Sequence, residues 1–303
     1  MLDAPKDHPN VVPGPLVRVD DHDDPRLLLY RDLNDPAGRI RLEADQSVFV
    51  VEGRLAVCRL LTSTYTVHSL LVDDHQVDAA SVLVAATRAL GVPVLVGSRA
   101  LVASTVGFAL HRGVVAVAHR PPPVGMERVL SDATGTSASR GTSPLVAVLE
   151  GLNDHENIGA LFRNAAAFGV AGVLLDPACA DPLYRRSIRV SVGHVLHVPF
   201  ARLAPWPTGL RQVRAAGFVV AAMAPHAPAD SGVPAVSLAE LKVSMSRSDH
   251  PGVALLLGAE GPGLTDSALA LADVVIRIPM AERVDSLNVA TAAAVAFHTL
   301  ADR

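Results

Sequence analysis

The C-terminal half of the chain holds six short apolar runs, separated by glycine or polar residues and by helix-like segments. Runs without polar alternation are typical of strands that are buried on both faces of a parallel sheet. Strands that alternate with helices in this way indicate an α/β fold. The predicted strands are 145–152, 172–176, 194–200, 218–223, 253–258 and 274–280, and a final helix is predicted over 287–301.

An earlier part of the chain shows a similar alternation and predicts another α/β domain over residues 46–122, with a mostly parallel sheet. Its predicted strands are 48–53, 67–74, 92–97 and 113–120, and its predicted helices are 54–63 and 79–91. A length of 303 residues also suits about two domains.

Two segments lack this pattern. Residues 1–45 are rich in Pro, Asp and Arg, which predicts an arm that is partly helical around Pro25–Leu33. After Pro121–Pro123, the small polar residues of 131–143 show no periodicity, so 123–143 is predicted to be a linker. The C-terminal domain then covers 144–303.

Composition limits the classes of function. The net charge of −4 argues mildly against a nucleic-acid binder, although a local basic patch can serve. Cys58 and Cys179 fit neither a metal site nor a disulfide framework, which favours a reducing compartment. We find no signal peptide and no apolar run of about 18 residues. A cytoplasmic protein without a membrane segment is therefore expected.

Three blocks in the C-terminal half join an apolar run to polar or glycine residues and then to a helix-like run. They are Asn157–Asn164, Leu255–Leu264 and Ile278–Ala293. Ligand sites in open α/β folds gather at such strand-to-helix junctions. The blocks therefore predict one composite site.

The first block opens a helix. Asn157 can cap its N-terminus, and Gly169 marks its end. Arg163 lies within this helix, six residues after Asn157. Its guanidinium is either a solvated surface group or a bidentate ligand of phosphate or carboxylate, and helical context leaves both open.

The second block places Gly258, Gly261 and Gly263 after a buried strand, where glycine permits positive φ and close approach of a ligand. This spacing matches neither the dinucleotide fingerprint nor a phosphate-binding P-loop, so an ordinary turn is the alternative. Glu260 inside the turn can accept hydrogen bonds from exposed N–H groups or from a ligand hydroxyl.

In the third block, Ser286 and Asn288 precede the last helix, where each is a helix cap or a ligand-binding group. The sequence lacks the GxSxG elbow that would indicate a serine hydrolase. His194 and His197 should point to opposite faces of one predicted strand. Because no other cluster has metal-ligand spacing, no metal site is predicted.

Together, the blocks resemble the three motifs of the SpoU (TrmH-like) RNA ribose 2′-O-methyltransferases of the SPOUT superfamily. The motif N-x-G-x-x-x-R is matched by Asn157, Gly159 and Arg163. The turn G-x-E-G-x-G is matched by Gly258, Glu260, Gly261 and Gly263. The motif I-P-M followed by S-L-N is matched by Ile278, Pro279, Met280, Ser286, Leu287 and Asn288. The resemblance covers about 146–301, in family order and without departure at these positions.

The resemblance implies a C-terminal domain with a deep trefoil knot that binds S-adenosyl-L-methionine, in a homodimer whose site is completed at the subunit interface. Residues 48–120 resemble, less specifically, the family's substrate-binding domain, which is similar in fold to ribosomal protein L30e. The implied cofactor-binding residues are Gly258, Glu260, Gly261, Gly263, Ile278, Met280, Ser286 and Leu287.

The implied reaction is methylation of a ribose 2′-oxygen in RNA, and the implied catalytic residues are Arg163, Asn157, Ser286, Asn288 and Glu260. In the family, the arginine that matches Arg163 is proposed to act as the base. Because a guanidinium keeps its proton at neutral pH, a clamp on the adjacent phosphate that polarises the hydroxyl is an equally good interpretation. Asn157 would orient Arg163 or the ribose, Ser286 and Asn288 would hold the nucleotide, and Glu260 would anchor the turn or contact the nucleotide.

The L30e-like domain favours ribosomal RNA over transfer RNA as the substrate. Candidate RNA contacts are Arg54, Arg59, Arg185, Arg186 and Arg189, for which a solvated helix face is the alternative. A non-catalytic RNA-binding or assembly protein on the same scaffold is the competing function. A dinucleotide-dependent dehydrogenase is not predicted, because no GxGxxG with a following acidic residue is present.

Overall fold

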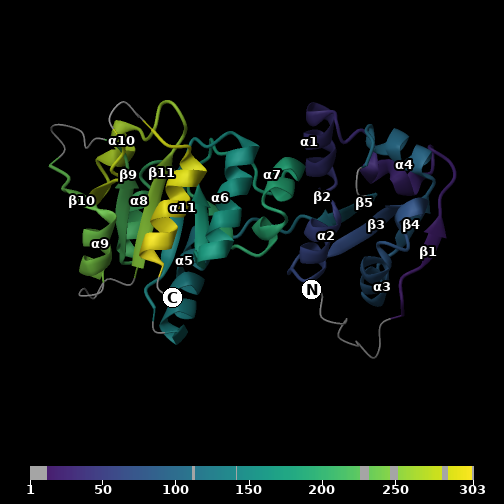
Figure 1. Ribbon diagram of the computed structural model, residues 1–303, viewed down its shortest axis with the longest axis horizontal. Helices are drawn as coiled ribbons and strands as arrows, with labels where there is room; N and C mark the ends of the chain where they lie inside the picture. Colours follow the sequence, from purple (N-terminus) through teal and green to yellow (C-terminus); the bar gives the residue numbers. More distant parts are fainter. Residues whose placement is uncertain are drawn as a thin grey trace. The chain divides into compact units, whose positions relative to one another are not determined.

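The computed structural model describes residues 12–110, 113–140, 142–225, 232–245, 252–281 and 286–301 (Figure 1). The chain divides into two compact units. Unit 1 comprises Met1–Pro122 and Leu183–His197, and unit 2 comprises Pro123–Pro182 and Val198–Arg303. Within the described residues, no helix is both long and apolar enough to cross a membrane.

Unit 1 is built on a five-stranded sheet with the order β1-β4-β3-β5-β2. Strands β1, β4 and β3 are parallel, whereas β5 runs antiparallel to both β3 and β2. The strands are β1 (Leu16–Arg18), β2 (Val48–Glu52), β3 (Val67–Asp73), β4 (Val94–Gly97) and β5 (Val114–His119). The helices are η1 (Pro25–Tyr30), α1 (Pro36–Asp45), α2 (Arg54–Leu61), η2 (Asp74–Gln76), α3 (Ser81–Ala89), α4 (Arg99–Val106), α7 (Arg185–Val190) and η3 (His194–Leu196).

The prediction of the four main strands of unit 1 is confirmed, and its sheet is mostly parallel as predicted, with β5 as the exception. Strands buried on both faces carry the same apolar run in either direction, so the run does not encode orientation. Helix α4 and strand β1 were not predicted. Ser98 caps α4, and Gly107 ends it with φ +83°.

The described part of the predicted arm, residues 12–45, belongs to unit 1; residues 1–11 lie outside the described residues. Strand β1 pairs with β4, and the side chains of Leu27, Tyr30 and Leu33 are buried in the core. The Tyr30 hydroxyl lies 2.6 Å from the Ser69 hydroxyl. The prediction of an arm is therefore wrong here, because three buried apolar side chains outweigh the polar composition around them.

Unit 2 contains a seven-stranded, fully parallel sheet with the order β10-β12-β9-β11-β6-β7-β8. Its strands are β6 (Leu145–Glu150), β7 (Gly172–Leu175), β8 (Phe200–Arg202), β9 (Phe218–Met223), β10 (Ala235–Ser237), β11 (Gly252–Gly258) and β12 (Val274–Arg277). Its helices are α5 (Met126–Arg140), α6 (His155–Phe168), α8 (Leu210–Ala215), α9 (Leu238–Met245), α10 (Asp266–Leu269) and α11 (Val289–Leu300). The parallel sheet predicted for this half is confirmed.

The predicted linker 123–143 is wrong, because α5 occupies most of it. Met126, Val129 and Leu130 are buried in the core of unit 2. Gly172 leaves room for Val129, since a Cβ there would lie 2.4 Å from a Val129 methyl carbon. Small and hydroxylated residues weaken a helix in isolation, but packing of one apolar face overrides that preference.

Two local predictions in this half are also wrong. The N-cap of α6 is Asp154 rather than Asn157, because the Asp154 side chain accepts from the Glu156 N–H. The predicted strand 194–200 is instead the short helix η3 followed by β8 at Phe200. Gly169 ends α6 with φ +71°, as predicted.

In the sequence, Leu183–His197 lies between β7 and β8 of unit 2. In the structure, this segment packs within unit 1. Arg185 pairs with Glu52, donates to the Leu33 carbonyl at 3.1 Å and lies over the Phe108 ring. His197 contacts the Arg59 carbonyl through Nε2 at 2.9 Å. These contacts attach the segment firmly to unit 1.

The cysteines lie apart as free thiols. Cys179 is buried, and its Sγ accepts a hydrogen bond from the Leu152 N–H at 3.3 Å, just after β6. Burial raises the pKa of the Cys179 thiol to about 12. This thiol therefore has a packing role.

Candidate functional site

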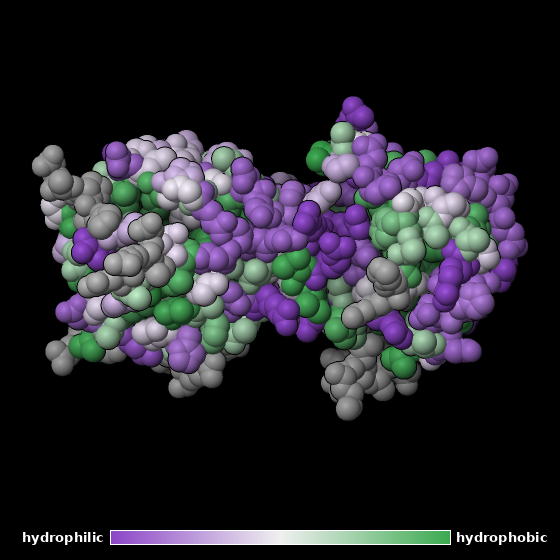
Figure 2. Space-filling model, turned by 45° about the horizontal axis from the view of Figure 1, so that its top comes forward, coloured by the Kyte–Doolittle hydropathy of each residue, from purple (hydrophilic) through white to green (hydrophobic). Residues whose placement is uncertain are grey.

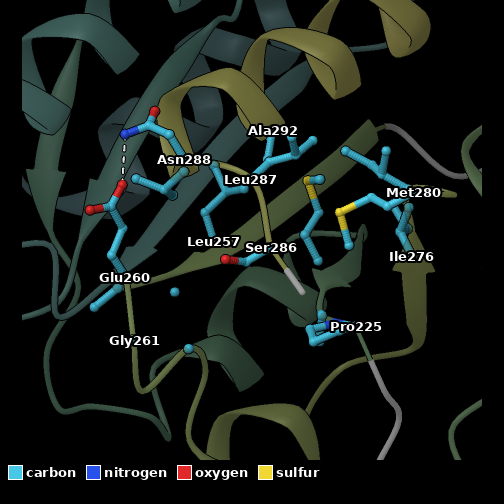
Figure 3. Close-up of a pocket in the computed structure, with 17 residues that line it drawn as sticks. Pro225, Leu257, Glu260, Gly261, Ile276, Met280, Ser286, Leu287, Asn288 and Ala292 are labelled. Carbon is cyan, nitrogen blue, oxygen red and sulfur yellow. Dashed lines mark hydrogen bonds between the residues drawn. The ribbon is translucent and has the colours of Figure 1, made fainter. Parts of the chain in front are cut away.

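The centre of the sheet in unit 2 presents three neighbouring strand ends at one edge. Strands β12, β9 and β11 are adjacent and parallel, so their carboxyl ends and the loops that follow lie together. A cavity of about 570 Å³ opens there. Its lining residues are Met223, Ala224, Pro225, Leu257, Gly258, Ala259, Glu260, Gly261, Gly263, Ile276, Ile278, Met280, Ser286, Leu287, Asn288, Val289 and Ala292 (Figure 3).

The glycine turn after β11 forms one wall of this cavity. It closes on itself through a bridge between Ala259 and Gly263, whose N–H donates to the Ala259 carbonyl at 3.0 Å. A Cβ on Gly258 would lie 2.4 Å from the Gly263 carbonyl carbon. Gly261 and Gly263 have φ of +86° and +70°. The turn therefore requires glycine for its own geometry, and at its glycines it presents backbone to the cavity.

Asn288 joins the three sequence blocks. Its amide nitrogen donates to Asn157 Oδ1 at 2.9 Å and to Glu260 Oε1 at 2.6 Å. Its Oδ1 caps α11 by accepting from the N–H groups of Ala290 and Thr291 at 3.0 and 3.1 Å. In Figure 3, Glu260 and Asn288 face each other on one side of the cavity, and Ile276 and Met280 lie on the other. One amide thus fixes the start of α11, the glycine turn and the first turns of α6.

Helix α6 packs beside α11, with which it shares a second side-chain contact (Figure 1). The Asn164 amide donates to the Ala290 carbonyl at 2.8 Å. This contact and the one between Asn157 and Asn288 attach the start of α11 to α6 at two places along α6.

Arg163 is exposed on α6 and does not line the cavity. No hydrogen bond or ion pair of Arg163 is formed with the described residues. The structure therefore leaves the Arg163 guanidinium exposed to solvent.

All eight residues that the sequence predicted for the cofactor line this single cavity. Of the predicted catalytic residues, Glu260, Ser286 and Asn288 also line it, and Asn157 is bonded to Asn288. Ser286 and Leu287 are exposed, and residues 282–285 before them lie outside the described residues. Sequence reasoning missed Met223, which ends β9, and Ala224 and Pro225, which follow it. The strand end and the proline were visible, but the position of β9 between β12 and β11 was not.

The candidate RNA-binding arginines all lie in unit 1, and most of them already contact other residues of that unit. Arg185 has the contacts described above, and Arg59 donates to the Val192 carbonyl at 2.5 Å. Arg54 donates to the Ala79 carbonyl at 3.0 Å and is partly exposed. Arg186 and Arg189 are exposed, and Arg189 Nη1 lies 4.0 Å from a Glu52 carboxylate oxygen. Figure 2 shows hydrophilic side chains over much of the visible face of each unit, interrupted by hydrophobic patches.

Comparisons with known proteins show what the chain is similar to. The family model of the SpoU rRNA Methylase family matches residues 144–298. An uncharacterized tRNA/rRNA methyltransferase of Mycobacterium bovis is 44% identical over 280 residues, which cover 92% of this chain and 90% of that protein. The 23S rRNA (guanosine-2′-O-)-methyltransferase RlmB of Vibrio vulnificus is 31% identical over 185 residues, which cover 61% of this chain and 68% of RlmB.

A solved structure shares the fold. The AdoMet-bound rRNA methyltransferase from Sinorhizobium meliloti aligns with a TM-score of 0.72 and 23% identity, over 94% of this chain and 97% of that chain. The family model covers more than half of the chain, and the mycobacterial relative matches nearly all of it. On the strength of these matches, the chain belongs to the SpoU rRNA methylase family.

Proposed function

We propose that the protein is an S-adenosyl-L-methionine-dependent RNA ribose 2′-O-methyltransferase. The observation that carries the proposal is the Asn288 side chain, which bonds Asn157 and Glu260 at the rim of an apolar cavity. A helix cap alone would need only the Asn288 oxygen. The Asn288 amide nitrogen also donates to Asn157 and Glu260, so polar groups from all three sequence blocks meet beside the cavity.

The residues that line the cavity fit the proposed cofactor. A volume of about 570 Å³ is in the range of small-molecule sites. Leu257, Ile276 and Ile278 offer apolar surface to an adenine ring, and the glycine turn offers backbone donors and acceptors. When bound, the cofactor supplies a methyl group on a positively charged sulfur. The Sinorhizobium meliloti relative is described with AdoMet bound.

The chain's own residues would position the accepting ribose and help its hydroxyl to lose a proton. Positioning alone can lower such a barrier by several kcal/mol. We assign to Arg163 a clamp on the phosphate next to the target ribose, from which its guanidinium also polarises the 2′-hydroxyl. The phosphate or solvent then takes the proton. Asn157 and Ser286 hold the nucleotide, and Glu260 keeps the turn in place through Asn288.

The strand order supports a knotted C-terminal region. The chain passes from β9 to β10 at the sheet edge, returns to the centre as β11, and crosses β9 again to form β12. It then continues into α11, which packs beside α6 (Figure 1). We propose that this return path threads the last segment through a deep trefoil knot.

Unit 1 would be the L30e-like domain that selects the RNA. The methyltransferase site would be completed by a second copy of the chain. The exposed Arg186 and Arg189 on α7 and the partly exposed Arg54 on α2 are its candidate phosphate contacts. The identity to RlmB, described as a 23S rRNA enzyme, supports ribosomal RNA over transfer RNA. Because Arg163 is exposed outside the cavity, a second subunit could bring RNA to it.

Titration calorimetry with S-adenosyl-L-methionine, followed by incubation of the protein with methyl-labelled cofactor and unmodified RNA, tests this proposal. We expect saturable binding and transfer of label to ribosomal RNA in preference to transfer RNA. Binding of RNA without any binding of the cofactor would instead favour the non-catalytic scaffold.

A further inference from the structure

A buried carboxylate lies directly beneath the glycine turn. Glu150 ends β6 and is only 5% exposed. Burying a carboxylate is costly unless it is well hydrogen-bonded. Glu150 meets that need with three bonds: Oε1 accepts from Trp206 Nε1 at 2.7 Å and from the Thr265 hydroxyl at 2.7 Å, and Oε2 accepts from the Thr265 N–H at 2.9 Å.

Thr265 is where the glycine turn ends. It is the N-cap of α10, and its hydroxyl accepts from the Ala268 N–H at 3.2 Å. The other end of the turn begins at Gly258, which pairs with Glu150 itself in the β11–β6 register. Glu150 therefore lies under both ends of the turn that carries Glu260.

We propose that Glu150 is a positioning residue that holds the glycine turn rigidly in place. Through the turn, Glu150 would determine the affinity of the cavity for S-adenosyl-L-methionine. The proposal rests on the proposed function, because it takes this turn to be the cofactor wall. Glu150 does not line the cavity and acts only through Thr265 and the turn.

Replacing Glu150 by Gln tests the acceptor requirement with almost no change in shape. The new amide nitrogen must face either the Thr265 N–H or the Trp206 Nε1–H, so two donors oppose each other in a buried place. We expect Glu150→Gln to weaken S-adenosyl-L-methionine binding by about tenfold. Its KM for the cofactor should rise while its KM for RNA stays unchanged.

Asp176 provides a matched control. It follows β7, is 4% exposed, and accepts from the Gly151 and Cys179 N–H groups at 3.0 and 2.7 Å. Asp176→Asn creates a similar conflict of donors without a bond to the turn. We expect its cofactor affinity to stay within about twofold of that of the unchanged protein, even if its Tm falls as far as that of Glu150→Gln.

Thr265 allows the same test if Glu150→Gln fails to fold. Thr265→Val removes the hydroxyl that binds Glu150, whereas Thr265→Ser keeps it. The serine variant should bind the cofactor as the unchanged protein does, and the valine variant should bind it more weakly. Equal affinity of both variants would overturn the proposal.

Hydrogen exchange of a peptide covering Gly258–Thr265, measured without cofactor, separates this proposal from the proposed function. Faster exchange in Glu150→Gln but not in Asp176→Asn is expected. Unchanged exchange, or unchanged cofactor affinity in a folded Glu150→Gln protein, would overturn the positioning role. A failure of the unchanged protein to bind cofactor would refute the proposed function, and the exchange result would still decide whether Glu150 holds the turn.

Discussion

The side-chain amide of Asn288 donates to the side-chain oxygen of Asn157 at 2.9 Å, across 131 residues of sequence. The contact joins the start of α11 to the start of α6. Because Asn288 Oδ1 accepts two backbone N–H groups, the orientation of its amide is set by the helix it caps. The amide nitrogen must then face Asn157 and Glu260. One side chain therefore both caps α11 and holds these two residues together at the cavity.

Substitution of Asn288 separates these two tasks. Asn288→Ala should lower the free energy of unfolding by about 1 kcal/mol, because the cap is lost. Asn288→Ser should keep most of that stability, since serine caps helices well, yet its side chain is too short to reach Asn157 and Glu260. Both variants should lose methyl transfer by about 100-fold. Denaturant unfolding and single-turnover transfer measure the two effects, and full activity in Asn288→Ser would contradict the role of the contact.

Arg163→Ala should leave the fold and cofactor affinity unchanged, because this side chain is exposed and has no partner among the described residues. Methyl transfer should fall by roughly 10²–10⁴-fold if the guanidinium holds the phosphate and polarises the hydroxyl. Arg163→Lys should not restore it, since lysine cannot form the bidentate contact. Near-normal single-turnover rates in either variant would show that the clamp is assigned to the wrong residue.

Gly258→Val should abolish cofactor binding. Its Cβ would lie 2.4 Å from the Gly263 carbonyl carbon and 2.5 Å from the Leu264 nitrogen, so the turn could not close. Gly261→Ala is the matched control, because a Cβ there meets nothing within 4 Å and only the positive φ of +86° is strained. That strain of about 1 kcal/mol should weaken binding by roughly fivefold. Calorimetric titration distinguishes the two, and equal effects would argue against the turn geometry.

Arg185 and Arg189 should behave differently although they lie on the same short helix. Arg185→Ala removes the closer of two arginine partners of Glu52 and should lower the Tm of the protein. Arg189 is exposed and lies 4.0 Å from Glu52, so Arg189→Ala should leave the Tm nearly unchanged, while RNA affinity and its dependence on salt both decrease. Thermal unfolding and RNA titration at several salt concentrations provide the test. A salt dependence that is unaltered in Arg189→Ala would exclude this arginine from the RNA surface.

Much of the cavity could be predicted from sequence, because its residues follow parallel strands directly. Gly258, Ile278 and Leu287 each follow an apolar run or precede a helix, and the carboxyl ends of neighbouring parallel strands meet at one edge. The order of the strands is not encoded locally. The segment Met223–Pro225 at the end of β9 was therefore missed, as were the hydrogen bonds of Glu150, whose partners lie 56 and 115 residues away.

Helix α5 and strand β5 show two other limits. The Ser- and Thr-rich sequence of α5 is a weak helix former that becomes stable only when Val129 and Leu130 pack on the sheet. The apolar run of β5 predicts a buried strand but does not specify that it runs antiparallel to β3. Both features depend on tertiary contacts, which a local pattern does not contain.

The most direct test of the account is to identify the nucleoside that receives the methyl group. Purified protein is incubated with methyl-labelled S-adenosyl-L-methionine and unmodified ribosomal RNA, and the product is digested to nucleosides. The account predicts label on a ribose 2′-oxygen, and loss of that label in Arg163→Ala. Label on a base would contradict the ribose mechanism, and its persistence in Arg163→Ala would contradict the assigned site.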